Sequence, residues 1–156
     1  MRPVVAKNPD QFKALGWLGE FLYYQGGFEE AEPDLDRAVQ LGRDSEDDTV
    51  RELAAVLYAS RHEREKIDRR LFQYRPEQII DGDDAYFLRG IYALLGEQKT
   101  ALDWLKRTVA LGNVNYPWFT RDRTYESLRA DPQYQAIMET VRQRWQAYKS
   151  EFDTAP

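Results

Sequence analysis

Apolar side chains recur at the spacing of an α-helix over most of this chain, and residues 15–39 carry the clearest example. Leu18 and Leu22 fall on one helical face, because three- and four-residue steps return to the same side of a helix. Gly26 and Gly27 then interrupt the pattern. A second amphipathic segment follows, and its apolar positions are Phe28, Ala31, Leu35 and Ala38. The stretch predicts a helical hairpin.

The same arrangement returns later in the chain, which indicates an internal repeat. Six positions of the first hairpin, from Leu18 to Ala38, have counterparts 70 residues further on, at Leu88, Tyr92, Gly96, Ala101, Leu105 and Thr108. An offset of twice about 35 residues predicts another copy in between. That copy is found at Ala54, Tyr58, His62, Ile67, Leu71 and Tyr74, although its small residues are mostly lost. We therefore predict three helical hairpins, at about residues 12–43, 48–78 and 83–112.

Beyond the third hairpin the pattern changes, and we interpret residues 113–152 as a C-terminal cap. An aromatic loop at residues 116–119 and a short helix near residues 124–129 come first. Asp131 and Pro132 then predict a helix N-cap and a first helical position. The last helix keeps one apolar face from end to end, at Tyr134, Ile137, Met138, Val141, Trp145, Tyr148 and Phe152. A stack of hairpins needs such a piece, because its final hairpin would otherwise leave an apolar face in water.

The hairpins resemble the tetratricopeptide repeat, a helix-turn-helix unit of about 34 residues. The likeness lies in the order apolar-x2-Leu-Gly-x2-apolar, then Ala-x3-apolar, with Gly19 and Ala31 small where two helices must approach closely. In the third copy Arg89 stands where this pattern has glycine, and the small residue Gly90 comes one place later. The resemblance implies an all-α fold: a right-handed α-solenoid of three TPR-like hairpins with a C-terminal capping helix, in which residues 1–156 form a single domain.

The C-terminal half adds a second resemblance. Residues 84–152 contain YALLGEQKTALDWLKRTVALG, then NYPWF, then LRADPQYQAIMETVRQRW. This run is similar to the C-terminal end of the tetratricopeptide regions attached to bacterial serine/threonine kinases, adenylate cyclases and winged-helix regulators. The sequence has no counterpart of the glycine-rich loop, catalytic Asp or recognition helix of those effector domains. The resemblance therefore implies a regulatory segment of a longer signalling protein. Asn8 and Pro9, which we expect to start the first helix, are typical of a join between repeats and favour the same interpretation.

The composition of the chain argues against two classes of function, nucleic-acid binding and membrane insertion. The chain has 156 residues, of which 31% are charged and 42% hydrophobic, and its formal net charge is −5. The acidic balance argues against a nucleic-acid binder, whose contact surface is basic. Cysteine is absent, and no apolar run approaches the ~20 residues of a membrane span. We expect a segment that neither inserts into a membrane nor binds nucleic acid. A cytoplasmic location is favoured, although the sequence does not fix the compartment.

Candidate chemistry is sparse. His62 is the single histidine, and it falls at a predicted turn where the neighbouring copies have glycine. Without cysteine or a second histidine it supports neither a metal site nor a nucleophilic triad. The sequence contains no phosphate-binding glycine loop and no HExxH pattern. We predict a non-catalytic protein with no metal and no cofactor.

The tetratricopeptide resemblance implies a scaffold that binds a peptide or protein partner in a concave groove lined by the first helix of each hairpin. Carried onto this sequence, the groove positions are Lys13, Glu20, Tyr23, Tyr24, Glu52, Val56, Ser60, Tyr86 and Leu94. The three tyrosines would be the aromatic anchors, because tyrosine supplies a large contact area at low entropic cost. Packing between repeats is the alternative for Tyr23 and Tyr86.

A second hypothesis makes the chain a sensor or self-association segment that regulates a fused signalling domain. Trp17 and Phe21 lie on the first predicted helix but off its main apolar seam. A preceding repeat or a second copy of the chain would cover them, and the latter predicts a homodimer. The alternative is that the seven N-terminal residues, or the second helix of the same hairpin, cover these two side chains.

Overall fold

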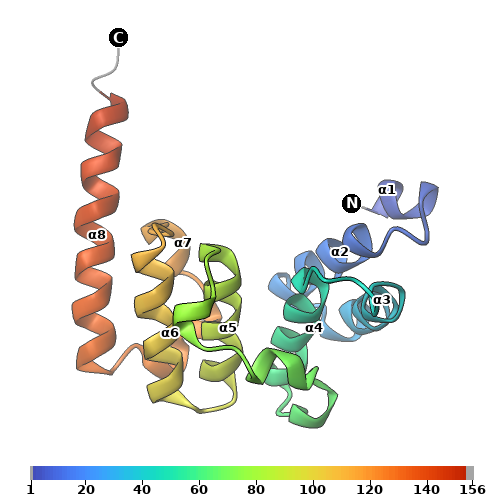
Figure 1. The fold of residues 1–156 in the computed structure, drawn as a ribbon. Helices are drawn as coiled ribbons and strands as arrows, with labels where there is room; N and C mark the ends of the chain where they lie inside the picture. The colour runs from blue at the N-terminus through green and yellow to red at the C-terminus, as the bar shows by residue number, and fades with distance from the viewer. Residues whose placement is uncertain (1, 154–156) are drawn as a thin grey trace. The chain divides into compact units, whose positions relative to one another are not determined.

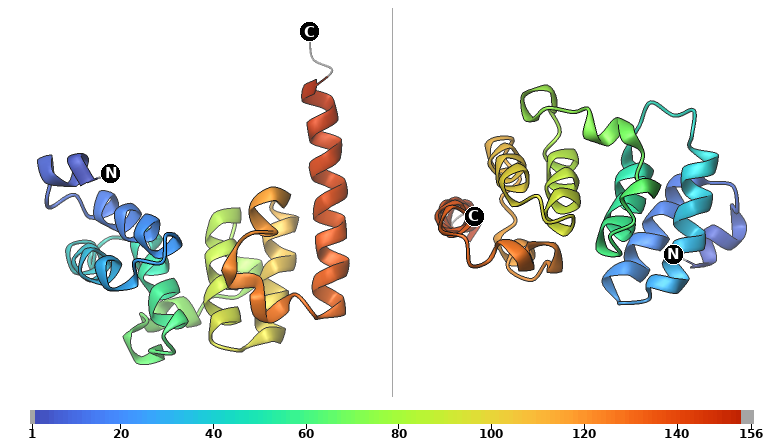
Figure 2. Two further views of the ribbon diagram at one scale, coloured as in Figure 1. Left: turned by 180° about the vertical axis from the view of Figure 1, so that it is seen from behind. Right: turned by 90° about the horizontal axis from the view of Figure 1, so that it is seen from below.

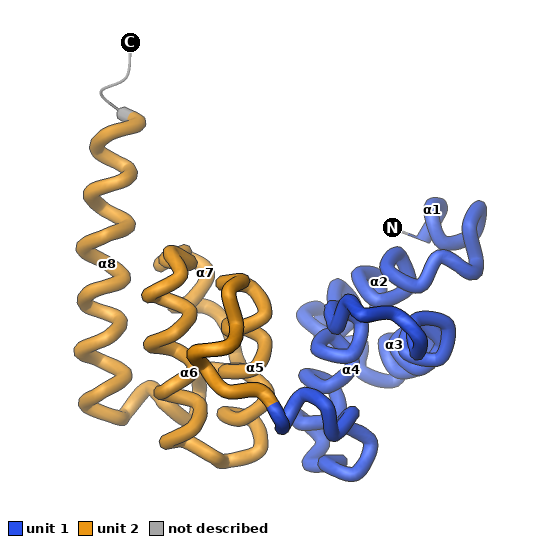
Figure 3. The backbone as a smooth tube through the Cα atoms, in the orientation of Figure 1, with its two compact units in different colours: residues 1–73 blue, residues 74–156 orange. Residues whose placement is uncertain are grey.

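In the computed structural model the chain is built from helices. The structure describes residues 2–153, with side chains described as far as residue 152, and these residues contain no strand. The all-α class predicted from the sequence is therefore confirmed. None of the described helices is both long and apolar enough to cross a bilayer. The chain divides into two compact units, Met1–Gln73 and Tyr74–Pro156 (Figure 3).

Unit 1 consists of a short N-terminal helix, a helical hairpin, a further helix and two 3-10 turns (Figure 1). In chain order its elements are α1 (Arg2–Lys7), α2 (Phe12–Tyr24), α3 (Phe28–Leu41), α4 (Thr49–Ser60), η1 (Arg64–Lys66) and η2 (Arg69–Phe72). Helix α2 packs along α3, and α4 packs against both of them. Leu15, Ala38 and Val50 bring the three helices together in one apolar cluster, against which Val5 and Phe12 pack.

Unit 2 contains a second helical hairpin, which is covered by the chain that follows it. Its elements are η3 (Pro76–Gln78), α5 (Gly82–Leu94), α6 (Gln98–Ala110), α7 (Tyr116–Phe119), η4 (Arg123–Leu128) and α8 (Pro132–Asp153). Helices α5 and α6 form the hairpin, and η4 packs on α5. Helix α8 lies beside α6, as the right-hand view of Figure 2 shows end-on.

Helices α2, α4 and α5 end in the same way. Gly26, His62 and Gly96 follow them with left-handed backbones, at φ angles of 85°, 60° and 80°. In each case the next amide donates a hydrogen bond of 2.9 Å to the carbonyl five residues earlier. This is the pattern of a Schellman motif, which usually requires glycine because a left-handed residue has no room for a Cβ atom. The three residues are matched positions of the predicted repeat, and they share this helix-end geometry.

The apolar positions of the repeat also form the core. Ala31, Leu35, Leu88 and Leu105 are each 0% exposed. A Cβ atom added to Gly19 would lie 2.4 Å from Cγ of Leu35, a distance that real Cβ contacts do not reach. The prediction that Gly19 is small because two helices approach closely there is confirmed.

The middle hairpin lacks its second helix, which corrects the prediction for residues 61–78. This segment forms three 3-10 turns instead, with an extended backbone at Ile67 (ψ 131°) and a non-helical one at Asp68 (ψ 122°). The Asp68 carboxylate accepts a hydrogen bond from the amide two residues later and lies 3.1 Å from Nε of Arg51. Such a local side-chain bond competes with helix formation. Ile67 and Leu71 are nevertheless buried, so the apolar period is kept without the helix.

The first helix of the hairpin starts later than predicted. Asn8 and Pro9 do not begin it, because α2 begins at Phe12 and residues 8–11 connect α1 to α2. Its N-cap is Gln11, whose side-chain Oε1 accepts a 2.8 Å hydrogen bond from the third helical amide. The side-chain oxygen of a glutamine can accept a hydrogen bond from an unpaired backbone amide of the first turn, as the oxygen of a shorter polar side chain does.

Helix α8 begins as predicted and covers α6 with its first half. Asp131 is the N-cap, and its carboxylate accepts a 2.7 Å hydrogen bond from the amide of Gln133. The apolar face is buried at Tyr134, Met138 and Val141. Further along, Tyr148 and Phe152 are 47% and 80% exposed, since α8 runs past the ends of α6 and α7 (Figure 1). The apolar face therefore caps the unit over part of its length, and not from end to end.

Candidate interaction surface

Helix α2 presents one side outward, and this side carries residues from both groups predicted to bind partners. Trp17 and Phe21 are one helical turn apart, and 46% and 52% of their surfaces are exposed. Lys13, Glu20 and Tyr24 are partly exposed. They lie on the same side, because they are separated from Trp17 by four, three and seven residues, which are spacings that return to one face of a helix. We call these five residues the α2 stripe. The structure thus brings three predicted groove residues together with the two predicted self-association residues.

Close contacts on a different side of α2 show which side packs inward. A Cβ atom on Gly16 would lie 2.9 Å from Cγ1 of Val50, and Gly19 meets Leu35 at still shorter range. The glycine side of α2 therefore presses against α3 and α4, and Trp17 and Phe21 lie on another side of the helix. Helix α1 and helix α3 leave Trp17 and Phe21 exposed, although each was a predicted cover for these side chains.

An ion pair holds the first residue of the stripe. Nζ of Lys13 pairs with the Asp47 carboxylate, which also accepts a 2.9 Å hydrogen bond from the amide of Thr49 at the start of α4. The bond from Lys13 is the main reason that the pKa of Asp47 falls to about 2, and the bonds from Thr49 lower this pKa further. Lys13 thus connects the stripe to the N-terminus of α4, and it still exposes 36% of its side chain.

Tyr23 lies in the interior, unlike its neighbour Tyr24. Its surface is 2% exposed. Its ring centroid lies 5.2 Å from that of Tyr24, in an edge-to-face arrangement, and 5.4 Å from that of Phe28. The three rings connect the end of α2 to the start of α3. In this structure Tyr23 occupies a packing position within the first hairpin, whereas the alternative to a groove anchor was packing between repeats.

The groove positions on α4 offer little accessible surface. Glu52 and Val56 are 2% and 5% exposed. Ser60 is partly exposed, and its hydroxyl donates a 2.7 Å hydrogen bond to the carbonyl of Leu57 in the same helix. None of these three side chains extends the α2 stripe.

The third aromatic anchor, Tyr86, is covered by the segment that follows α6. Its surface is 7% exposed. Its hydroxyl donates to the Asp122 carboxylate and accepts a 2.6 Å hydrogen bond from Nε1 of Trp118. Its ring stacks on Phe119, with centroids 5.4 Å apart. Leu94, the last predicted groove residue, is partly exposed near the end of α5.

Sequence reasoning missed the buried polar network around Arg89. This side chain replaces the glycine of the repeat pattern, and its Nη2 lies 3.1 Å from Oδ2 of Asp122, with both side chains buried. Its guanidinium lies over the rings of Tyr86 and Tyr125, at 4.4 and 3.7 Å from their centroids, and its Nη1 donates to Thr124. Electrostatic attraction to the ring faces adds to the ion pair. The signal in the sequence was an arginine on the apolar face of a helix.

No group of three or more His, Cys, Asp or Glu residues in the described part of the chain is arranged to hold a metal ion. His62 is exposed at its turn. Comparisons of the chain with models of protein families, with curated proteins and with solved structures found no match.

Proposed function

We propose that this chain is a non-catalytic protein–protein interaction module and that the α2 stripe is its binding surface. The exposure of Trp17 and Phe21, at 46% and 52%, carries the proposal. Large aromatic side chains supply much of the binding energy at protein interfaces. Scattered exposed apolar residues are ordinary, but two aromatic residues on successive turns of one helix make a continuous patch.

The size of this patch sets the strength of binding that it can support. An aromatic side chain presents about 150–250 Å² of surface, and covering apolar surface is worth about 25 cal/mol per Å². With about half of each side chain exposed, burying both Trp17 and Phe21 is worth on the order of 5 kcal/mol. Association itself costs an estimated 4–15 kcal/mol or more. The aromatic pair alone therefore gives weak binding, and the polar residues of the stripe have to contribute.

The shape of the stripe favours a helical partner. Its residues follow one side of a helix of 13 residues, and the complementary surface for such a row is the apolar side of another helix. Lys13 lies toward the N-terminal end of the stripe and Glu20 lies further along. An antiparallel pair of two copies would bring each Lys13 near the other copy's Glu20, in a closed two-fold interface. A second copy of the chain is therefore the first partner to test.

Self-association fits the role that the sequence resemblance implies. A regulatory segment that dimerises brings together the signalling domains to which it is fused. The tetratricopeptide resemblance also supports a second candidate, a peptide-binding scaffold. Glu20 and Tyr24 favour it because both are predicted groove residues that stay partly exposed, whereas the predicted anchors Tyr23 and Tyr86 are buried.

A selection of displayed helical peptides against the native chain tests the proposal and separates the two candidates. Peptides that bind through the stripe should lose binding when Trp17 and Phe21 are both replaced by serine. The exposed Tyr148 on α8 provides the control, since Tyr148→Ser should leave binding unchanged. Selected peptides that bind the double variant as well as the native chain, but fail to bind Leu94→Ala, a partly exposed groove position outside the stripe, would contradict the stripe and support the peptide groove.

A further inference from the structure

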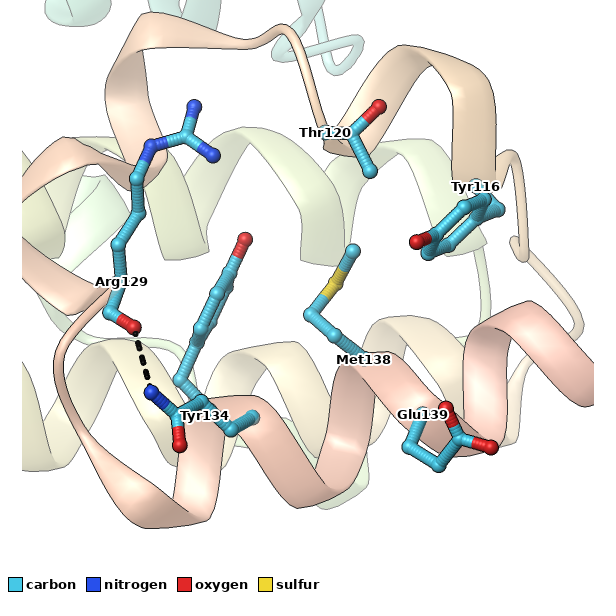
Figure 4. A pocket seen from close by; sticks show the side chains of 7 residues that line it. Tyr116, Thr120, Arg129, Tyr134, Met138 and Glu139 are labelled. Atoms are coloured by element: carbon cyan, nitrogen blue, oxygen red, sulfur yellow. Dashed lines mark hydrogen bonds between the residues drawn. The ribbon is translucent and has the colours of Figure 1, made fainter.

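Unit 2 contains a pocket of about 320 Å³ that is independent of the α2 stripe (Figure 4). Its volume is at the lower end of the range for small-molecule sites, about 300–1,000 Å³. Helix α7, the end of η4 and the first turns of α8 supply its walls. The residues that matter for its chemistry are Tyr116, Thr120, Arg129, Tyr134, Met138 and Glu139.

The hydroxyl of Tyr134 points into this pocket (Figure 4). Tyr134 is 5% exposed, and its ring centroid lies 5.4 Å from that of Tyr125 in the core. Its hydroxyl makes no hydrogen bond to any other residue in the described part of the chain. Burial raises the pKa of Tyr134, so the phenol stays neutral and can donate a proton to an acceptor. The ring of Tyr134 is packed while its hydroxyl reaches the open space of the pocket, where it can donate a hydrogen bond to an acceptor group on a ligand.

Arg129 supplies a second donor at the same pocket. Its Nε donates to the Glu126 carboxylate at 3.1 Å, and its Nη2 donates to the Asp122 carbonyl at 3.3 Å. These two bonds hold the guanidinium in place. Its Nη1 has no hydrogen-bond partner among the residues that the structure describes. Guanidinium groups bind carboxylates strongly, because both the charge and the planar arrangement of donors match.

The other side of the pocket is apolar and ends in a carboxylate that is already engaged. Met138 and the ring of Tyr116 lie away from Arg129 in Figure 4, with Glu139 beside them. The Glu139 carboxylate accepts hydrogen bonds of 2.6 and 2.8 Å from Arg142 and 2.8 Å from Gln143. These bonds lower the pKa of Glu139 to about 2, chiefly through Arg142. A permanent negative charge here disfavours an anionic group at this end of the pocket.

We propose that this pocket binds a compact carboxylate with an apolar body. The carboxylate accepts hydrogen bonds from the hydroxyl of Tyr134 and from Nη1 of Arg129, and the apolar body lies against Met138 and the ring of Tyr116. Such a group could belong to a small free acid or to the C-terminus of a peptide. The site shares no residue with the α2 stripe, so it does not depend on the proposed function.

Titration of the whole chain with 3-phenylpropanoate and with the matched neutral amide, 3-phenylpropanamide, tests this proposal. Binding is followed by the ¹H–¹⁵N chemical shifts of the backbone amides. We expect saturable shifts in α7, η4 and the first half of α8 with the acid, and affinity for the amide at least about tenfold lower. Absence of saturable shifts with the acid, or equal affinity for acid and amide, would overturn the proposal.

Replacing Tyr134 by phenylalanine removes the donor and keeps the ring on Tyr125. Since the hydroxyl has no partner within the described part of the chain, the variant should unfold at the same urea concentration as the native chain. Its affinity for 3-phenylpropanoate should fall about fivefold or more. Tyr148→Phe, on an exposed tyrosine outside the pocket, should bind as the native chain does. Undiminished binding by Tyr134→Phe would show that the hydroxyl does not hold the carboxylate.

A peptide identifies the source of the carboxylate. N-acetyl-Ala-Ala-Phe is compared in its free-acid and C-terminal amide forms. Tighter binding of the free-acid peptide than of 3-phenylpropanoate assigns the site to peptide C-termini, and weaker binding assigns it to small free acids. Each result supports the proposed chemistry, whereas equal binding of the acid and amide peptides, together with no response to 3-phenylpropanoate, contradicts it.

Discussion

Nη2 of Arg89 lies 3.1 Å from Oδ2 of Asp122, and the pair joins α5 to the start of η4 inside unit 2. Removing one member of a buried ion pair leaves the other charge unpaired, at a cost of about 3–5 kcal/mol. We expect Arg89→Met to lower the free energy of unfolding by that amount in urea titrations.

The exposed Arg121 provides the control for this variant. Arg121→Ala should change the free energy of unfolding by less than about 0.5 kcal/mol. The double variant Arg89→Met/Asp122→Leu should lose less than the sum of the two single variants, because it leaves no unpaired charge. A cost for Arg89→Met no larger than that of Arg121→Ala would show that the pair does not hold η4 on α5.

Replacing two glycines, Gly19 and Gly90, by alanine should have different effects on the free energy of unfolding. A Cβ atom on Gly19 would overlap Leu35, whereas one on Gly90 would meet Thr124 at 3.6 Å, an ordinary contact distance. We expect Gly19→Ala to cost about 1–3 kcal/mol in the free energy of unfolding through overpacking. Gly90→Ala should be neutral, or stabilising by up to about 1 kcal/mol, because alanine favours helix. Equal effects would contradict the close approach of α2 and α3 at Gly19.

His62 adopts the backbone conformation for which the two matched positions use glycine. Its φ of 60° brings its Cβ atom close to backbone atoms, which costs roughly 1–2 kcal/mol for a residue other than glycine. His62→Gly should therefore raise the free energy of unfolding by up to about 1 kcal/mol, after the larger entropy loss of glycine on folding. Gly26→Ala should destabilise the chain. If His62→Gly destabilised it instead, the turn after α4 would not match the other two.

The local features of the fold could be predicted from the sequence. Glycine at a helix end and apolar residues at three- and four-residue steps act over a few residues, so the hairpins α2–α3 and α5–α6 and the N-cap at Asp131 were found. The missing helix at residues 61–78 could not be found in this way. Its apolar period is intact, and although the bond from the Arg70 amide to Asp68 is local, the contact between Asp68 and Arg51 joins distant parts of the chain and has no local pattern.

For the candidate sites too, local patterns in the sequence predicted where some residues lie and missed those that depend on distant contacts. Trp17 and Phe21 were predicted from their place on the helix, because helical geometry alone puts them off the apolar seam. Tyr86 was predicted as a groove residue, and its burial depends on Asp122, 36 residues away in the chain. The pocket at Tyr134 had no signal in the sequence, since tyrosine on the apolar face of a helix is ordinary.

The ion pair between Lys13 and Asp47 should make stability depend on pH. The pKa of Asp47 in the folded chain is about 2, below its value of about 3.9 in an unfolded chain. The carboxylate therefore stabilises the fold above about pH 4, and this contribution disappears as the pH falls toward 2. Both side chains are more than a third exposed, so water screens the pair and the gain is about 1 kcal/mol or less.

Comparison of the native chain with Asp47→Asn measures this contribution. In urea titrations the variant should be less stable at pH 7, by no more than about 1 kcal/mol, and the difference should vanish near pH 2. A difference that stays constant between pH 7 and pH 2 would mean that it does not arise from the charge of Asp47.

Sedimentation equilibrium of the native chain over about a hundredfold range of concentration tests the role of the α2 stripe most directly. We predict a reversible dimer at the higher concentrations. The Trp17→Ser/Phe21→Ser variant should stay monomeric over the same range, and Tyr148→Ser should dimerise as the native chain does. A native chain that is monomeric throughout, or a double variant that dimerises equally well, would contradict self-association through the α2 stripe.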